Sequence, residues 1–398
     1  MSNIGGTRSS KELPRLALPL LYLGAVFSGA LTVLLGCILP RLSAVEHLRD
    51  KDAGALLMIQ FAFCASGALL VRRNYHETLA RGYALISLGA LALHMLPKQF
   101  AIPAIATYGI GLGLVMTSNS MLTGRIFTER RGVALSFLNL CWSVGATISP
   151  LLIARFFGRV SIGLISTTVA VLSALFVAVP LVGRFRRVVE DDGRISTPLG
   201  SATPTIAYFG LLAFLYVGIE SATGNWMSTY ASRVVAWDYT KSNLATACFW
   251  AALLLGRTAA PLILLWVAEV KLYLISVFGA ASGVLLLVAA HSAWLVLLAA
   301  AIAGLGLAPI FPLTVSLFMA KAGQPKSTGW VFAVSGFGAA VLPWLTGVVS
   351  SSARSLRVGL LVPAGAALLL LILACRLNSA AEENALKPLP SKVAPRQA

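Results

Sequence analysis

The chain has 398 residues, of which 58% are hydrophobic and only 11% are charged, and its mean hydropathy is +0.85. A soluble domain carries roughly 25% charged residues and could not cover so much apolar side chain with polar surface. The composition therefore excludes a soluble globular protein and indicates a chain that is embedded in the lipid bilayer. The net charge of +17 comes from short basic clusters between apolar runs, so we expect no nucleic-acid partner.

Apolar runs that are long enough to cross a bilayer follow one another along the whole chain. The ninth and tenth runs are separated only by the short sequence Ala290-His291-Ser292. The longest polar stretch within the chain, from Gly183 to Pro204, divides the runs into two groups of six. We therefore predict twelve membrane-spanning helices, over residues 17–41, 52–71, 79–97, 100–124, 131–157, 160–183, 204–231, 242–266, 271–290, 293–320, 327–350 and 356–376.

The expected fold is an all-α membrane protein with two six-helix bundles, the layout of transporters that place their site between two bundles. With the N-terminus inside, the inner segments hold 21 Lys and Arg residues and the outer segments hold 10. Basic residues are enriched in cytoplasmic loops, so we expect a multi-pass protein of the plasma (inner) membrane with both termini in the cytoplasm. The expected parts are an N-terminal bundle (1–183), a cytoplasmic linker (184–203), a C-terminal bundle (204–376) and a disordered cytoplasmic tail (377–398).

Several patterns that are typical of enzymes and metal sites are missing from the sequence. The five cysteines lie in apolar runs without a Cys-x-x-Cys pair, and the four histidines lack the spacing of metal ligands. The sequence has no phosphate-binding loop, no Gly-x-Ser-x-Gly elbow and no His-Glu-x-x-His motif. We therefore expect no metal, no cofactor and no enzymatic activity.

Glu220 is the sharpest polar feature of the spans, because an acidic side chain inside an apolar helix costs about 3 kcal/mol on insertion scales. Such a group faces water, pairs with a base or carries a proton. We expect Glu220 to contact a solute or to carry coupling protons, and the alternative is a structural partner of an arginine. Arg257, near the inner end of the eighth span, could pair with a carboxylate or gate the cytoplasmic side, and the alternative is an interfacial charge that snorkels to the surface.

Amide and indole side chains inside the spans suit a hydroxylated solute, because amides both donate and accept hydrogen bonds and aromatic faces stack on sugar C–H groups. Asn225 and Trp226 are favoured because they follow Glu220 on the same helix. The alternative for each residue is packing between helices or interfacial anchoring. The candidate substrate-binding residues are Glu220, Asn225, Trp226, Asn119, Asn139, Trp142, Gln60, Trp250 and Trp330, with Arg257 as a gating or structural charge.

Four segments of the C-terminal half, Phe214–Ala231, Phe249–Arg257, Gly304–Pro312 and Gly338–Gly347, carry a family resemblance. They resemble the major facilitator superfamily, and more narrowly its fucose-galactose-glucose symporter-like branch. Weaker matches in the N-terminal half are Gly111–Gly113 with Asn119, and Leu138-Asn139 with Gly145-Ala146. The resemblance implies two six-helix bundles that rock around a central site, sugar substrates and, in many members, proton coupling.

The sequence departs from the fucose permease pattern at its carboxylates. The first span has no acidic residue, and Met116 stands where the carboxylate of the fourth span belongs. The usual proton carriers are therefore missing, and Glu220 is the remaining candidate.

We predict a secondary active or facilitative transporter of a small polar solute, most simply a sugar, that works by alternating access as a monomer in the lipid bilayer. Protons coupled through Glu220 and the solute gradient alone are both open as driving forces. The alternative is an efflux carrier for drugs or other amphipathic, lipid-like molecules, whose site would be more apolar.

Overall fold

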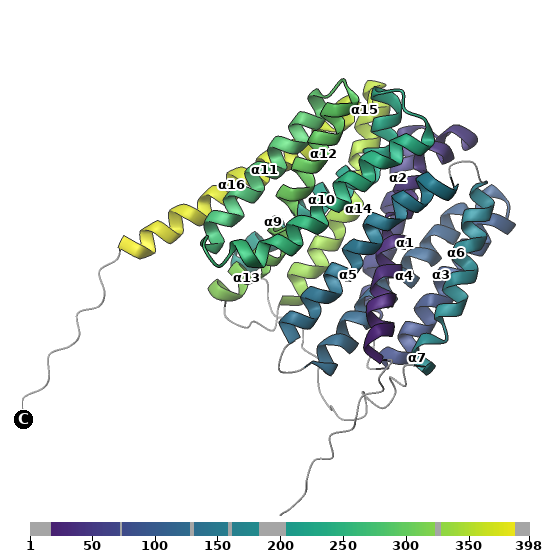
Figure 1. Cartoon of the computed structure of the whole chain (residues 1–398), viewed down its shortest axis with the longest axis horizontal. Helices are drawn as coiled ribbons and strands as arrows, with labels where there is room; N and C mark the ends of the chain where they lie inside the picture. Colours follow the sequence, from purple (N-terminus) through teal and green to yellow (C-terminus); the bar gives the residue numbers. More distant parts are fainter. Residues whose placement is uncertain are drawn as a thin grey trace, which may run out of the picture.

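The computed structural model describes residues 17–71, 74–127, 131–157, 161–182, 204–322 and 328–386 (Figure 1). This part of the chain consists of helices joined by short connections. The expected cytoplasmic linker over 184–203 lies outside the described residues, as do residues 387–398 of the expected tail. The helix α16 runs to Leu386, into the segment that we expected to be disordered from residue 377.

Helices of the N-terminal part, purple to teal in Figure 1, lie beside those of the C-terminal part, green to yellow. The first group is α1 (Ala17–Glu46), α2 (Asp50–Leu69), α3 (Tyr75–Met95), the 3-10 turn η1 (Lys98–Phe100), α4 (Ala101–Ile126), α5 (Arg131–Leu152), the π-helical turn η2 (Ile153–Phe157), α6 (Ile162–Phe176) and α7 (Val179–Val182). The second group is α9 (Pro204–Val234), α10 (Tyr239–Ile263), α11 (Glu269–Ala289), α12 (Ala293–Leu307), α13 (Ile310–Ala322), α14 (Thr328–Ala353), α15 (Leu356–Gly359) and α16 (Leu361–Leu386).

Ten segments of the described chain are long and apolar enough to cross a membrane. The other two expected spans correspond to α3 and α6. The helix α3 carries Glu77 and Arg81 in its first two turns, and α6 has only 15 residues. Each of the twelve predicted spans therefore coincides with a helix or a pair of consecutive helices, although two of them have weaker membrane character.

Local sequence explains where the helices around the tenth span begin and end. The Ser292 side chain accepts a hydrogen bond from the backbone N–H of Leu295 and caps α12, so the short break before it is a true helix boundary. The predicted span 293–320 is not one continuous helix, because α12 ends at Leu307 and α13 begins at Ile310. Pro309 lies in this gap and has no amide hydrogen to donate to the preceding turn.

Small residues allow the helices within each half to approach closely, as is common where no water drives their association. A Cβ atom at Gly29 of α1 would overlap the backbone carbonyl of Trp142 on α5, and one at Gly145 of α5 would overlap the carbonyl of Val26. In the second half, Gly306 of α12 similarly lies against the backbone of Ala280 on α11. The glycines that the sequence places in the spans therefore mark contacts between helix backbones.

The most extensive contacts between the two halves are those of α2 with α14, α5 with α10, and α1 with α9. The helices α1, α9 and α14 all end, and α2 begins, at one end of the bundle, which we name the Asp50 end after the first residue of α2. The opposite end, where α9 begins, is named the Pro204 end. The buried apolar core continues from α1 and α2 into the helices of the second half.

Candidate functional site

Glu220 of α9 and Arg257 of α10 form a buried ion pair between two helices of the second half. The Nη2 atom of Arg257 donates to Oε1 of Glu220 at 2.9 Å. Only 11% of the Glu220 side-chain surface and 17% of the Arg257 side-chain surface are exposed. Glu220 is therefore paired with an arginine in this conformation, and Arg257 lies in the interior rather than at the surface.

Two hydroxyl groups complete the arrangement around Arg257. Tyr216 lies one turn before Glu220 on α9, and its hydroxyl oxygen accepts a hydrogen bond from Arg257 Nη2 at 3.3 Å. Ser143 of α5 accepts from Arg257 Nη1 at 2.8 Å. Because Ser143 donates its own hydroxyl hydrogen to the carbonyl of Asn139, its lone pairs are free to accept from the guanidinium. One arginine therefore connects both halves of the protein.

Two indole rings lie beside this arginine and meet across the same boundary. The rings of Trp142 on α5 and Trp250 on α10 are edge-to-face, with centroids 5.7 Å apart. The guanidinium carbon of Arg257 lies 5.7 Å from the centroid of the Trp142 ring, within reach of a cation–π interaction. The indole N–H groups of Trp142 and Trp250 are both buried and neither has a hydrogen-bond partner. We name Glu220, Arg257, Tyr216, Ser143, Trp142 and Trp250 together the Arg257 cluster.

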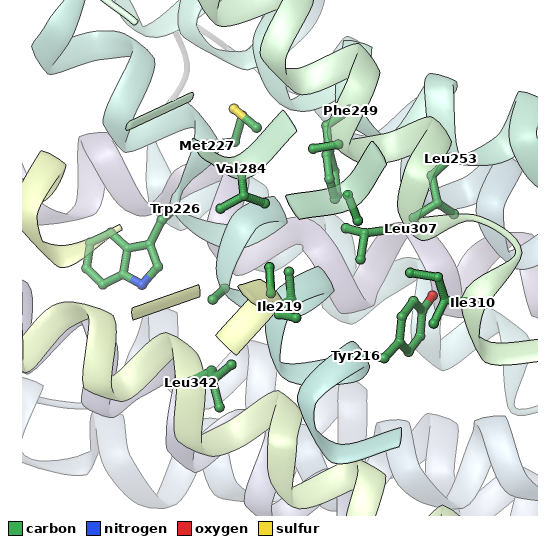
Figure 2. Packing of buried hydrophobic residues seen from close by; sticks show 14 of the residues in the cluster. Tyr216, Ile219, Trp226, Met227, Phe249, Leu253, Val284, Leu307, Ile310 and Leu342 are labelled. Carbon is green, nitrogen blue, oxygen red and sulfur yellow. The ribbon is translucent and has the colours of Figure 1, made fainter. Parts of the chain in front are cut away.

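Gly224 and the interruption between α12 and α13 shape the surroundings of this cluster. A Cβ atom at Gly224 of α9 would lie 2.7 Å from the Trp250 ring, so only glycine lets this indole pack against α9. The Tyr216 ring stacks on Phe311, with centroids 5.8 Å apart, at the start of α13. Figure 2 shows Tyr216 beside Ile310, the first residue of α13.

The cluster is electrically neutral but rich in donors and acceptors. An ion pair in a low-dielectric interior needs further hydrogen bonds to offset its desolvation, and Tyr216 and Ser143 supply them to Arg257. Removing one partner of such a pair leaves an uncompensated charge and costs about 3–5 kcal/mol. Two unpaired indole donors next to an ion pair can bind a neutral molecule that carries several hydroxyl groups.

The structure does not place the two favoured residues, Asn225 and Trp226, in this cluster. The Trp226 side chain is fully buried within the apolar core that both halves share (Figure 2), and its indole N–H donates to the carbonyl of Pro343 at 2.9 Å. The Asn225 amide nitrogen donates to the carbonyl of Ser221 at 2.8 Å on its own helix. In this conformation Trp226 packs α9 against α14, and its stacking on a solute stays a prediction.

Two other amides hold helices of the first half together. The Asn119 amide donates to the Leu21 carbonyl at 3.1 Å and joins α4 to α1. The Gln60 amide donates to the Thr32 carbonyl at 3.0 Å and joins α2 to α1. Asn139 is exposed and lies one turn before Ser143 on α5, toward the Pro204 end. The side chain of Trp330, the remaining candidate, lies outside the described residues.

Sequence reasoning missed four polar residues at the boundary between the halves. Tyr216 had a signal, since it stands one helical turn before Glu220, whereas Ser143 resembles any serine in an apolar span. Asp50 and Arg233 lie just outside the predicted spans 52–71 and 204–231, and they form a salt bridge of 2.6 Å between α2 and α9. Within the described part of the chain, no three His, Cys, Asp or Glu side chains come together in a way that could hold a metal ion.

Comparisons with solved structures identify the fold that carries this cluster. The chain is similar to a bacterial homologue of the human lysosomal transporter Spinster in an inward-facing and occupied conformation, with a TM-score of 0.66 and 14% identity over 94% of this chain and 98% of that one. It is also similar to the major facilitator superfamily transporter FucP in the outward conformation, with a TM-score of 0.60 and 19% identity over 90% of this chain and 98% of that one. No protein-family model and no curated protein match the sequence. The chain therefore has the major facilitator fold, which confirms the fold class predicted from the sequence.

Proposed function

We propose that this protein is a secondary transporter of a small, neutral, hydroxyl-rich solute, most simply a sugar, and that the Arg257 cluster is its binding site. The observation that carries the proposal is the pair of unpartnered indole donors, Trp142 and Trp250, beside a neutral Glu220–Arg257 pair at the junction of the two halves. In two-bundle transporters the substrate site lies between the bundles near the middle of the membrane. The major facilitator fold supports the same assignment.

The chemistry of the cluster matches a polyhydroxylated ring. Arg257 offers several donors, the Glu220 carboxylate accepts, and the two indole N–H groups add donors of fixed direction. Indole faces also present an apolar surface to the C–H groups of a sugar. A net charge of zero around the pair disfavours a charged solute, because its charge would be desolvated without a counterion.

In an alternating-access cycle, the bonds between the halves would stabilise one arrangement of the halves relative to the other. The Arg257–Ser143 hydrogen bond and the Trp142–Trp250 contact both cross from α5 to α10. A solute hydroxyl that takes the place of Ser143 on the guanidinium loosens this connection. The free energy of solute binding can then favour one arrangement of the halves over the other, since a ligand shifts an equilibrium only by its differential affinity.

We also propose that Glu220 is the site of proton coupling. A proton on its carboxylate would neutralise one partner of the ion pair and free Arg257 to bind the solute. The ionised pair would keep Arg257 occupied in the empty transporter, so proton and solute would be bound and released together. Transport driven by the solute gradient alone remains the alternative, and it would leave Glu220 as a fixed binding residue.

The efflux of amphipathic molecules is the competing function. The buried indole N–H groups of Trp142 and Trp250 favour a polar solute over an apolar one, because an apolar ligand would leave both donors unpaired. We further propose the topology and assembly that the basic residues and the composition indicate: a monomer of the plasma (inner) membrane, with both termini in the cytoplasm and a transport rather than an enzymatic role.

Uptake by liposomes that contain the purified protein tests the function. We expect accumulation or counterflow of at least one labelled neutral sugar or polyol from a broad panel, and competition by that solute alone. Liposomes with Arg257→Ala protein are the matched negative sample. A failure of every sugar and polyol, together with transport of an amphipathic dye, would replace this proposal with the efflux function.

A further inference from the structure

We infer that Asp50, Arg233 and Ser350 form a charge-based latch that holds the Asp50 end of the transporter closed, and that Asp50 sets the balance between its closed and open states. Asp50 is at the start of α2 in the first half, whereas Arg233 of α9 and Ser350 of α14 belong to the second half. This inference rests on the proposed transport cycle for its consequence, but the opening of this end can be measured without a solute.

The latch has the geometry of a strong, directional contact. Arg233 binds Asp50 through both of its terminal nitrogens, with Nη1–Oδ2 at 2.7 Å and Nη2–Oδ1 at 2.6 Å. The Ser350 hydroxyl donates to the same carboxylate at 2.5 Å. Asp50 retains only 10% of its side-chain exposure, although Arg233 retains 42%. Bidentate arginine–carboxylate pairs are stronger and more selective in geometry than single hydrogen bonds.

Backbone contacts next to the latch show that the two halves are in close contact at this end. The backbone N–H of Lys51 donates to Ser351 Oγ at 2.7 Å. A Cβ atom at Gly347 of α14 would overlap the Asp50 carbonyl, and one at Gly54 of α2 would lie 3.2 Å from the Pro343 carbonyl. Opening this end therefore requires α2 to separate from α14, and the Asp50 carboxylate must then lose all of its partners in the second half at once.

Polar atoms between the latch and the Arg257 cluster indicate that this contact is temporary. Asn243 of α10 donates to the carbonyl of Cys37 on α1, but its own side-chain oxygen has no partner. The side-chain oxygen of Asn225 faces Gly36 of α1 and is also unpartnered. The hydroxyl of Tyr239, whose ring lies under Arg41 of α1, is a third such group. Buried polar groups without partners are costly, and water can reach these three once the halves separate.

These two observations together define a two-state element. The closed state is stabilised by the bonds of Asp50 to Arg233 and Ser350. The open state is stabilised by hydration of the unpaired polar groups of α9 and α10 that face α1. The Asp50 carboxylate binds Arg233 and Ser350, which do not belong to the Arg257 cluster. It therefore acts on transport through this balance and is a positioning residue. Removing its charge is expected to raise the population of the state that is open at the Asp50 end.

Thr229 provides a reporter position for this opening. It lies on α9 between Asn225 and Arg233, which both contact the first half, so it belongs to the same helical stripe. Its side chain is 1% exposed and its hydroxyl has no hydrogen-bond partner, so replacement by cysteine removes no bond. The five native cysteines would first be replaced, and Thr229→Cys would then be alkylated with a charged methanethiosulfonate reagent.

We expect Asp50→Asn to raise the alkylation rate of Cys at position 229 by about tenfold or more, since Arg233 loses its bidentate carboxylate partner. Ser350→Ala should raise it less, because the ion pair remains. The exchanged pair Asp50→Arg with Arg233→Asp should return the rate toward that of the parent protein. Asp52→Asn is the matched control, since Asp52 is on the same helix but pairs locally with Arg49 at 3.2 Å.

An alkylation rate at position 229 for Asp50→Asn that is within twofold of the rate for the Asp52→Asn control would contradict the proposed latch. If Asp50→Asn does not yield folded protein, Ser350→Ala with the exchanged pair decides the question by the same readout. The result is independent of the proposed solute, because no sugar is present. A latch without sugar transport, or sugar transport without a latch, would thus be recognised as separate outcomes.

Discussion

Arg257 on α10 and Ser143 on α5 are joined by a hydrogen bond of 2.8 Å, although 114 positions separate them in the sequence. The same guanidinium binds Glu220 and Tyr216 of α9, so one side chain links three helices across the boundary between the halves. Only arginine has a planar fork of donors that can make these contacts simultaneously. The site therefore depends on the shape of this side chain as well as on its charge.

Substitutions of Arg257 separate the effect of its charge from the effect of its shape. Arg257→Lys keeps the positive charge but offers one ammonium group, so we expect transport to fall by about a hundredfold if two charge-assisted bonds are lost. Arg257→Ala should also lower the free energy of unfolding by about 3–5 kcal/mol, because Glu220 loses its partner. Initial uptake rates and thermal unfolding in detergent measure the two effects.

A double variant controls for this instability. In Glu220→Gln with Arg257→Met, neither charge remains, and we expect most of the lost stability to return while transport stays absent. Arg81→Ala, at an exposed surface pair with Glu77, should leave both quantities unchanged. Normal uptake by Arg257→Lys would show that the positive charge is sufficient for transport. It would contradict a role for the shape of the guanidinium group.

The substitution Glu220→Gln tests proton coupling. Glutamine resembles the protonated carboxyl group in shape and cannot exchange a proton, so accumulation driven by a pH gradient should be abolished. Exchange of labelled against unlabelled solute should persist, since it needs no net proton movement. Both are measured in the same liposomes with an imposed pH gradient.

Glu269→Gln is the matched control for this experiment, because Glu269 lies at the start of α11 and binds Ser316 outside the cluster. The rates of accumulation and exchange by the Glu269→Gln variant should match those of the parent protein. Retained accumulation in Glu220→Gln liposomes would contradict proton coupling at this residue and would favour transport driven by the solute gradient alone.

The apolar pattern of the sequence predicts the helices well, because a bilayer requires long hydrophobic runs and each run leaves a direct compositional signal. Glu220 was found for the same reason, since an acid inside such a run is conspicuous. The pairing of Glu220 with Arg257 was only one of two alternatives, because the rotation of α10 relative to α9 depends on packing that one sequence does not display.

The remaining site residues depend on contacts between distant segments. Ser143 and Asp50 carry no signal of their own, and their importance comes from α5 meeting α10 and from α2 meeting α9 and α14. The sequence also places Trp226 beside Asn225, which favoured a site role for both. Which face of α9 points toward the core is decided by α14, whose Pro343 carbonyl accepts the Trp226 indole N–H.

The two indole donors of the cluster should contribute directly to solute affinity. Trp142→Phe and Trp250→Phe each keep an aromatic ring but remove one unpartnered N–H. A hydrogen bond to the solute contributes about 1 kcal/mol, so the half-saturation concentration should rise about fivefold for each variant. Trp294→Phe is the control, since Trp294 is 70% exposed at the start of α12. Unchanged half-saturation in both variants would remove the indoles from the binding site.

Trp226 is expected to behave in the opposite way from these two residues. Trp226→Phe leaves the Pro343 carbonyl without its donor and a gap in the core between α9 and α14, which should destabilise the protein by about 1–3 kcal/mol. The half-saturation concentration should stay within twofold of the parent value, because the indole is fully buried away from the Arg257 cluster in this conformation. Thermal unfolding and uptake kinetics on the same preparation measure both. A loss of solute affinity at unchanged stability would return Trp226 to the binding site, as its position next to Asn225 in the sequence suggests.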